Sequence, residues 1–162
     1  GGKNWPAGAY SPLTNTMYFP LKQTCARVLS TMEGGLAIYR LAARFQLAPG
    51  TDNLGTVRAI SVETGRTTWV HEQRAATQAL VTTGGGLVFG GDGNGRFRAF
   101  DQDTGMVLWE INLGSPVTGF PITYAVAGRQ YVVASTGSRT EGLTPELHPS
   151  AGNNLFVFAL PD

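Results

Sequence analysis

The stretch that decides the fold runs from Ala59 to Trp69 and reads AISVETGRTTW. A second stretch, from Ala99 to Trp109, reads AFDQDTGMVLW. The two begin 40 positions apart, at 59 and 99, and both place alanine, a Thr-Gly pair and tryptophan at the same steps. A fixed period of about 40 residues built from strand-like units is typical of propeller blades. The repeat therefore predicts an all-β chain made of stacked blades.

The composition agrees with a sheet-rich protein. Hydrophobic residues make up 42% of the chain and charged residues 14%, while the 22 glycines suit many tight turns. The net charge of +1 gives no strong attraction to nucleic acid or to anionic lipid. Apolar runs have the length of strands and are too short for a membrane span. Cys25 is the single cysteine, which excludes a disulfide within the chain, and we expect it to be an ordinary small apolar side chain.

Strand and turn patterns divide the chain into about three blades of four strands. We place them at residues 8–70, 77–113 and 120–160, with residues 26–54 as an irregular insertion in the first. Propellers close with about 4–8 blades, and an open stack would leave apolar faces and unpaired strand edges. We therefore expect the C-terminal part of a longer propeller, a partial ring. Assembly with other chains is the alternative.

The recurring tryptophan has a structural explanation. A large aromatic side chain fills the gap between adjacent blades and can donate its indole N–H to a backbone carbonyl. The Thr-Gly pair supplies the tight turn before it. For Trp69 and Trp109 we expect this packing role, and truncation of either to alanine should cost about 3–5 kcal/mol. Asp101 and Asp103 lie in the same turn and are expected to be structural.

The phrase from Ala99 to Trp109 resembles the tryptophan-docking repeat of the quinoprotein alcohol dehydrogenases, which depend on pyrroloquinoline quinone (PQQ). Three further segments resemble the alcohol dehydrogenase branch: the opening GGKNWPAGAYSP at 1–12, the block from Leu113 to Val132, and the ending NLFVFALP at 154–161. The resemblance covers nearly the whole chain. It implies the C-terminal part of an eight-bladed propeller.

The resemblance also implies a function for the intact protein. That function is oxidation of an alcohol to an aldehyde or ketone by a periplasmic enzyme that uses PQQ and calcium and passes electrons to a cytochrome c. In the family the catalytic aspartate and the calcium ligands lie on earlier blades. No catalytic or metal-binding residue is therefore carried over to this segment, and the segment alone is expected to be inactive. Its expected contribution is a floor for the cofactor and closure of the ring with the missing blades.

By resemblance, Asn4 and Trp5 would contact the quinone from a loop at the top of a blade. An amide N–H₂ suits the oxygen-rich rim of PQQ, and an indole can donate or pack. Judged from the residues alone, Asn4 would make a loop hydrogen bond and Trp5 would pack between blades. Val117 or Thr118 is expected to give a further contact. Lys3 is a third possibility because its cation suits the cofactor carboxylates, but we favour a solvated side chain.

A rival class is a non-enzymatic scaffold propeller of the outer-membrane assembly lipoprotein type, which has similar repeats and no quinone. Nothing in the chain adds another kind of active site, because no Ser/His/Asp arrangement or phosphate loop is present. His71 and His148 are far apart and lack a metal-ligand spacing. We expect both to be surface or loop residues.

Overall fold

The computed structural model describes residues 2–33, 38–138, 143–144, 146–147 and 149–160, and it omits the side chains of 29–33 and 38–42. The described residues form three antiparallel sheets and one separate hairpin. The first sheet has the order β1-β2-β5-β6, with β1 (Ala9–Ser11), β2 (Thr16–Lys22), β5 (Gly55–Ser61) and β6 (Thr67–Gln73). The second has the order β10-β9-β8-β7, with β7 (Thr77–Thr82), β8 (Leu87–Asp92), β9 (Arg96–Asp101) and β10 (Val107–Asn112). No helix able to cross a membrane occurs in these residues.

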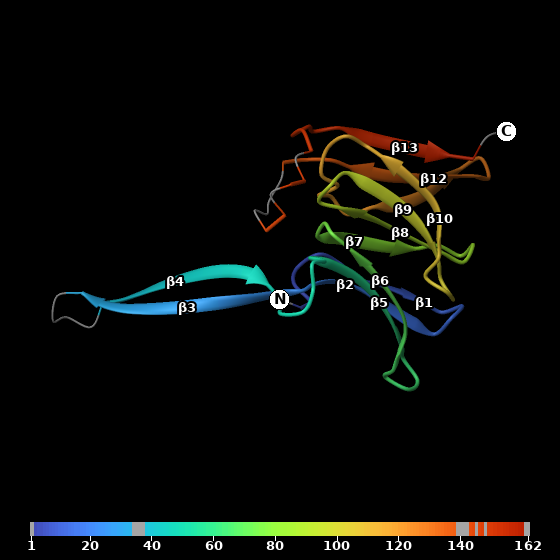
Figure 1. Cartoon of the computed structure of the whole chain (residues 1–162). Helices are drawn as coiled ribbons and strands as arrows, with labels where there is room; N and C mark the ends of the chain where they lie inside the picture. Colours follow the sequence, from blue (N-terminus) through green and yellow to red (C-terminus); the bar gives the residue numbers. More distant parts are fainter. Residues whose placement is uncertain (1, 34–37, 139–142, 145, 148, 161–162) are drawn as a thin grey trace.

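The third sheet has three strands in the order β11-β12-β13, namely β11 (Ile122–Val126), β12 (Arg129–Ser135) and β13 (Leu155–Ala159). Figure 1 shows the sheets stacked one on another, from the β1 sheet to the β13 sheet. This arrangement of blades confirms the all-β, partial-ring expectation, although the third unit has three described strands where four were expected.

Because every pairing is antiparallel, the connections gather at two opposite ends of the sheets. We call one the turn end, which carries the tight turns at 12–15, 62–66, 83–86, 102–106 and 127–128. We call the other the loop end, which carries residues 2–8, the loops 74–76, 93–95 and 113–121, and the described parts of the connections 23–54 and 136–154.

Trp69 docks the first sheet on the second at the turn end. Its Nε1 donates to the carbonyl oxygen of Gln102 at 2.9 Å, and its ring is 8% exposed. The ring lies directly over Gly105, where an added Cβ would come within 2.5 Å of it. Gly105 also has a φ of +72°, a conformation that favours glycine. The expected docking role of Trp69 is therefore confirmed, and its target is the Thr-Gly turn of the next repeat.

Gln102 joins four segments through bonds that the sequence did not single out. Its carbonyl also accepts from the Tyr18 hydroxyl at 3.0 Å. Its side-chain amide donates to the carbonyls of Thr83 and Leu87, and its Oε1 accepts from the hydroxyl of Ser11. The side chain is almost fully buried, and each of its polar atoms is satisfied, as a buried amide requires.

Asp101 shapes the turn beneath Trp69. Its Oδ1 accepts from the backbone amides of Asp103 and Thr104 and from the Thr104 hydroxyl. The Thr104 hydroxyl and amide hydrogen bonds lower the pKa of Asp101 because they stabilise its charged form. This local cap confirms the structural role expected of Asp101.

Trp109 behaves differently from Trp69. It stands opposite Ala99, as Trp69 stands opposite Ala59, and a register shift interrupts both pairings next to the tryptophan. Its ring packs edge-on against Phe97 and Phe158, but it remains 38% exposed. The turn of the third sheet is Ala127-Gly128, which lacks the Asp-x-x-Thr-Gly sequence of the second. Trp109 therefore has packing partners without the buried socket of Trp69.

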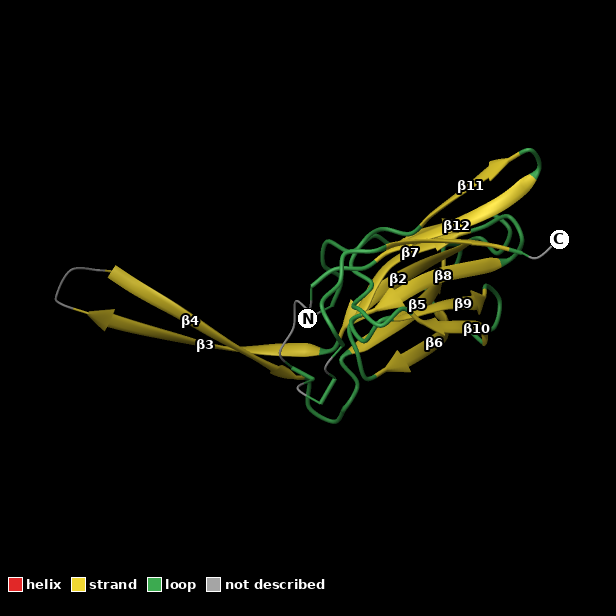
Figure 2. Cartoon of the chain, turned by 90° about the horizontal axis from the view of Figure 1, so that it is seen from above, coloured by secondary structure: helices red, strands yellow, loops and turns green. Residues whose placement is uncertain are grey.

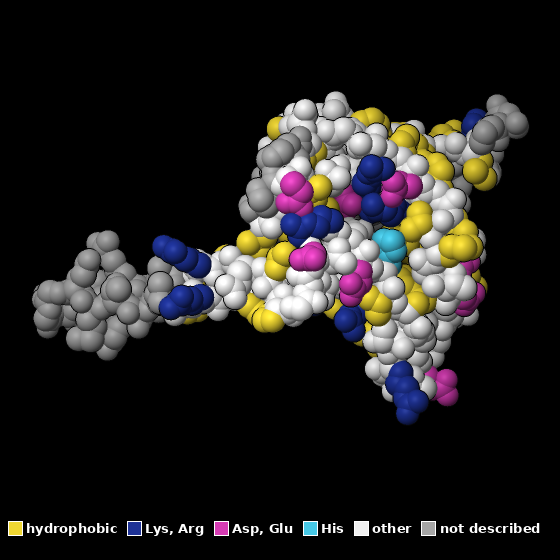
Figure 3. Space-filling model, in the orientation of Figure 1, with side chains coloured by type: hydrophobic (Ala, Val, Ile, Leu, Met, Phe, Trp, Pro, Cys, Tyr) yellow, Lys and Arg dark blue, Asp and Glu magenta, His cyan; other side chains and the backbone are white. Residues whose placement is uncertain are grey.

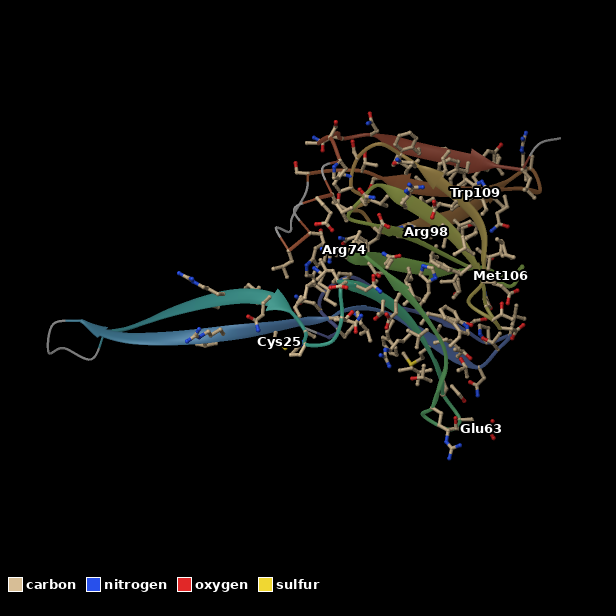
Figure 4. The ribbon with its side chains drawn as sticks, viewed as in Figure 1. Cys25, Glu63, Arg74, Arg98, Met106 and Trp109 are labelled. Carbon is tan, nitrogen blue, oxygen red and sulfur yellow. The ribbon has the colours of Figure 1, made fainter. Side chains whose placement is uncertain are left out.

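The residues expected to form an irregular insertion are instead mostly a hairpin. Its strands β3 (Thr24–Glu33) and β4 (Ile38–Leu47) pair over ten positions and extend away from the stacked sheets (Figures 1 and 2). Cys25 is exposed on this hairpin (Figure 4), so it is not part of an apolar core. The hairpin leaves from the loop end.

Charged side chains gather on one face over the outer strands β6 and β10 (Figure 3). Arg98 bonds Asp92 and Glu110 on its own sheet and reaches Gln73 on the first sheet at 2.9 Å. His71, on β6, lies edge-on to Phe100 with ring centroids 5.0 Å apart, so it is partly buried rather than a simple surface residue. Burial, followed by the charge of Arg98, lowers the pKa of His71. His148 lies outside the described residues.

Replacing Gly105 with alanine tests the docking contact. Gly65 occupies the same place in the preceding repeat with φ +68°, but an added Cβ there meets nothing within 4 Å. Gly65→Ala should therefore cost about 1–2 kcal/mol from backbone conformation alone. Gly105→Ala should cost about 1–3 kcal/mol more because its methyl group overlaps the Trp69 ring. Urea unfolding of the two variants measures the difference, and equal losses would contradict the docking geometry.

The lowered pKa of His71 predicts a pH dependence of stability. The unfolded chain takes up a proton near pH 6.5, whereas the folded chain resists protonation at that pH. The free energy of unfolding should therefore fall as the pH drops through about 6.5. Denaturant midpoints between pH 8 and pH 5 measure the slope. His71→Gln should flatten it, and an unchanged slope in that variant would assign the effect to another group.

Candidate cofactor-facing site

The loop end is held together by main-chain hydrogen bonds that run from loop to loop, including the segments 74–76 and 113–121 that connect one sheet to the next. We call this series the loop-end belt. It consists of the N–H to O bonds Leu54 to Arg74, Gly93 to Ala76, Leu113 to Gly95, Val117 to Asp92, Gly137 to Pro116 and Thr136 to Asn154. These distances lie between 2.8 and 3.3 Å. The belt fixes the backbone of each loop relative to its neighbours, so side chains on different loops keep defined relative positions.

The N-terminal segment is attached to this end at two places. Gly2 and Lys22 exchange both backbone hydrogen bonds, and the Ala7 carbonyl accepts from Leu80 N–H at 3.0 Å. Lys3 bridges the loop between them, because its ammonium donates to the carbonyls of Asn4 and Pro6. Lys3 thus ties the loop that presents Asn4, rather than standing as a freely solvated side chain.

In the side-chain amide of Asn4, the oxygen is hydrogen-bonded to the backbone and the N–H₂ group remains available to a ligand. Its Oδ1 accepts from the backbone N–H of Trp5 at 2.9 Å, while the residue itself is exposed. Since the carbonyl half is taken by the backbone, the N–H₂ half is the part left to donate outward. Asn4 can therefore make the expected loop hydrogen bond and still donate to a ligand.

Trp5 meets the second expected segment through Phe120. The two ring centroids are 5.7 Å apart at an interplanar angle of 57°. Trp5 is 65% exposed and Phe120 is 51% exposed, so the pair forms an aromatic corner open to solvent. Phe120 lies within the block from Leu113 to Val132 that carries the family resemblance, but sequence alone assigned no role to its side chain.

Val117 and Thr118 face different surroundings. The side chain of Val117 is buried with Phe97, Leu113 and Ala134, and it fills the space beside Gly91. It is therefore part of the core, and it does not offer its side chain to a ligand at the surface. Thr118 is half-buried at the start of the 118–121 segment.

The loop that carries Thr118 packs closely on the end of β12. An added Cβ at Gly119 would come within 1.8 Å of the Ser135 hydroxyl oxygen, and one at Gly137 within 2.4 Å of the Thr118 hydroxyl oxygen. These glycines allow the loop and the end of β12 to approach closely, and the backbone bonds from Gly119 to Ser135 and from Gly137 to Pro116 hold the two together.

Arg74 ties two more loops at this end (Figure 4). Its guanidinium donates to the Glu146 carboxylate and to the Asp52 carbonyl. Both side chains of the ion pair are exposed, so the bond adds little stability of its own. Among the described residues no three His, Cys, Asp or Glu side chains come together as a group that could hold a metal. The site chemistry available here is hydrogen-bond donation and aromatic packing.

A family model described as the β-propeller domain of glucose, ethanol and alcohol dehydrogenases that use PQQ matches residues 51–132. Quinoprotein alcohol dehydrogenase PedE of Pseudomonas putida is 36% identical over 141 residues, covering 85% of this chain and 22% of that protein. A 1-butanol dehydrogenase (quinone) of Thauera butanivorans is 30% identical and covers 99% of this chain and 27% of that protein. The chain thus spans about a quarter of the length of these relatives.

A solved structure of a europium-containing methanol dehydrogenase superposes on 99% of this chain with a TM-score of 0.84 at 27% identity, and the match covers 33% of that structure. The matched sheets include the insertion hairpin, since nearly the whole chain is covered. The repeat, the docking of Trp69, and these matches together place the chain in one family. The chain belongs to the PQQ-dependent glucose/ethanol/alcohol dehydrogenase family and forms part of its β-propeller domain.

Proposed function

We propose that this chain is the C-terminal part of the catalytic propeller of a periplasmic, PQQ-dependent alcohol dehydrogenase. The intact enzyme would oxidise an alcohol to an aldehyde or ketone and pass the electrons to a cytochrome c. Membership of the family supports the proposal. The observation that carries it is the meeting of two distant segments, residues 3–5 and 118–120, at the loop end through the Trp5–Phe120 contact.

The residues at this corner suit one side of the cofactor. PQQ is flat and carries carbonyl and carboxylate oxygens around its rim, and when bound it supplies the two-electron acceptor for alcohol oxidation. The free N–H₂ of Asn4 and the hydroxyl of Thr118 would donate to rim oxygens. Trp5 would pack on the cofactor or donate from its indole. Lys3 would hold the loop that carries Asn4 through its hydrogen bonds to the carbonyls of Asn4 and Pro6. Val117 would contribute to the core with its buried side chain.

The proton-accepting aspartate and the calcium ligands would come from blades beyond this segment. The described residues do not gather a metal-ligand cluster, so the proposed role of this segment is limited to holding the cofactor and docking blades. By the same argument, the segment would be inactive alone. The identity of the bound metal should be measured, because the solved methanol dehydrogenase that resembles this chain contains europium.

The proposal is tested by denaturing the native protein and measuring what is released. We expect one quinone chromophore per chain, identified by its absorption spectrum, together with calcium or a lanthanide detected by elemental analysis. The rival is a scaffold propeller, whose docking turns would be the same and whose corner residues would be structural. Native protein that is fully folded by circular dichroism, releases no quinone and does not take up added PQQ would favour the scaffold.

Asn4→Ala tests the corner directly. Loss of one neutral hydrogen bond should weaken PQQ binding to the metal-loaded apoenzyme by about two- to tenfold. Asn4→Asp should weaken it further, because a carboxylate replaces the donor and repels the cofactor carboxylates. Absorbance or fluorescence titration gives the dissociation constants.

Asn53→Ala is the matched control for this titration. Its amide donates to Glu72 on β6 at 3.2 Å, directed to an outer strand and not to the corner. Equal losses in the Asn4 and Asn53 variants would show that Asn4 acts through folding and not through the cofactor.

A further inference from the structure

Trp5 is the one tryptophan of this chain that is mostly in solvent, at 65% exposed against 8% for Trp69 and 38% for Trp109. An exposed aromatic side chain on a loop populates several rotamers. A ligand that binds only one of these rotamers binds more weakly, because the side chain loses conformational entropy on binding. The backbone on both sides of Trp5 is fixed by Gly2, Lys3 and Ala7, as described above. What remains to be fixed is the direction of the indole.

Phe120 is the ring that the structure places against that indole. The centroid separation of 5.7 Å and the tilt of 57° fall in the range where aromatic pairs attract one another. The contact joins residues 115 positions apart in sequence, at 5 and 120, so it is not a consequence of local chain geometry. It therefore restricts Trp5 from outside its own loop.

Phe120 is itself mounted on rigid backbone. Gly119 before it lies against Ser135 of β12, with a backbone hydrogen bond of 3.4 Å. Pro121 after it is buried, has a fixed φ, and precedes the first residue of β11. The backbone of both residues is held, but Trp5 is the more exposed ring and stands on a loop tied by the Lys3 side chain, whereas Phe120 stands between a glycine packed on β12 and a buried proline. The pair is therefore asymmetric, with Phe120 as support and Trp5 as the supported side chain.

We propose that Phe120 is the positioning residue that orients Trp5 for contact with the cofactor. This inference rests on the proposed function for the identity of the ligand, which is PQQ. Phe120 acts through Trp5 by removing rotamers of the indole before binding, so the loss of Phe120 appears as weaker binding of the cofactor. Removal of Phe120 should also leave Trp5 more mobile in the absence of any ligand.

The test is a double-mutant cycle on the full-length apoprotein, loaded with metal and titrated with PQQ. Phe120→Ala should raise the dissociation constant of PQQ by about two- to tenfold, the range of an aromatic pair. In a Trp5→Ala background the same substitution should have no further effect, because there is no indole left to position. Phe120→Leu, which keeps an apolar side chain next to Pro121, should reproduce part of the loss even if the alanine variant is poorly folded.

A second readout requires no PQQ. Acrylamide quenching of Trp5, isolated as the difference from a Trp5→Phe protein, should become faster in Phe120→Ala than in the parent. Tyr124→Ala is the matched control, since Tyr124 is an exposed aromatic on β11 that stacks on Tyr131 at 5.1 Å. It removes an aromatic pair only four residues further along the chain and should leave both the quenching of Trp5 and PQQ binding unchanged.

The two readouts separate the possible failures. Faster quenching with no PQQ binding by the parent protein would overturn the proposed function while keeping the Phe120–Trp5 support. A loss of PQQ affinity that persists undiminished in the Trp5→Ala background would overturn the positioning role, because Phe120 would then act on the cofactor by itself. Unchanged quenching in Phe120→Ala would also overturn it.

Discussion

Trp69 reaches from the outer strand of one sheet into the turn of the next and donates to the carbonyl of Gln102. The same carbonyl receives the Tyr18 hydroxyl, so the first sheet donates two hydrogen bonds to one main-chain oxygen of the second. Gly105 lets the indole approach the turn directly. This socket fixes the first sheet on the second at the turn end, and it thereby helps to place the loops at the opposite end of these two sheets.

The two ends of the sheets have different roles, one in packing the sheets together and the other in presenting side chains to solvent. At the turn end the hydrogen bonds that dock the first sheet on the second are buried and satisfied, with Gln102 as the shared residue. At the loop end polar groups and two aromatic rings are left open to solvent. A cofactor bound at the loop end would therefore contact side chains whose mobility is limited by the belt beneath them, and the packing that stabilises the fold would be left undisturbed.

Much of this arrangement of blades could be predicted from the repeat in the sequence. The tryptophan and the Thr-Gly pair recur at fixed steps, so the blades and the docking contact could be expected, and Asp101 could be placed in the docking turn although Ser61 stands at its position in the other copy. The pairing of Gln102 could not, because a buried amide at one repeat position has no counterpart in the other copy. Phe120 was missed for a related reason. Its importance depends on a ring 115 positions away, and a loop without periodicity gives no sign of which residues it meets.

Two further parts of the chain differ from what the sequence suggested, Val117 in the direction of its side chain and residues 26–54 in their regular strand pairing. Val117 lies in a loop, where no alternation tells the buried side from the open one, and a close approach to Gly91 turns it inward. Residues 26–54 did not fit the blade repeat because β3 and β4 pair with each other and not with a strand of a blade. The segments Ala26-Arg27-Val28 and Ala43-Arg44-Phe45 pair with one another in the hairpin, with Arg27 opposite Arg44.

The loop-end belt has a consequence for how this surface can change over evolutionary time. Its bonds run between backbone atoms, so they do not depend on which side chains the loops carry, apart from the close-packed glycines. Exposed positions around Asn4, Trp5 and Phe120 can therefore accept new residues while the scaffold keeps its shape. A change of an exposed side chain at the loop end therefore leaves the backbone contacts between the loops in place, whereas a change at the turn end acts directly on the docking contact of Trp69.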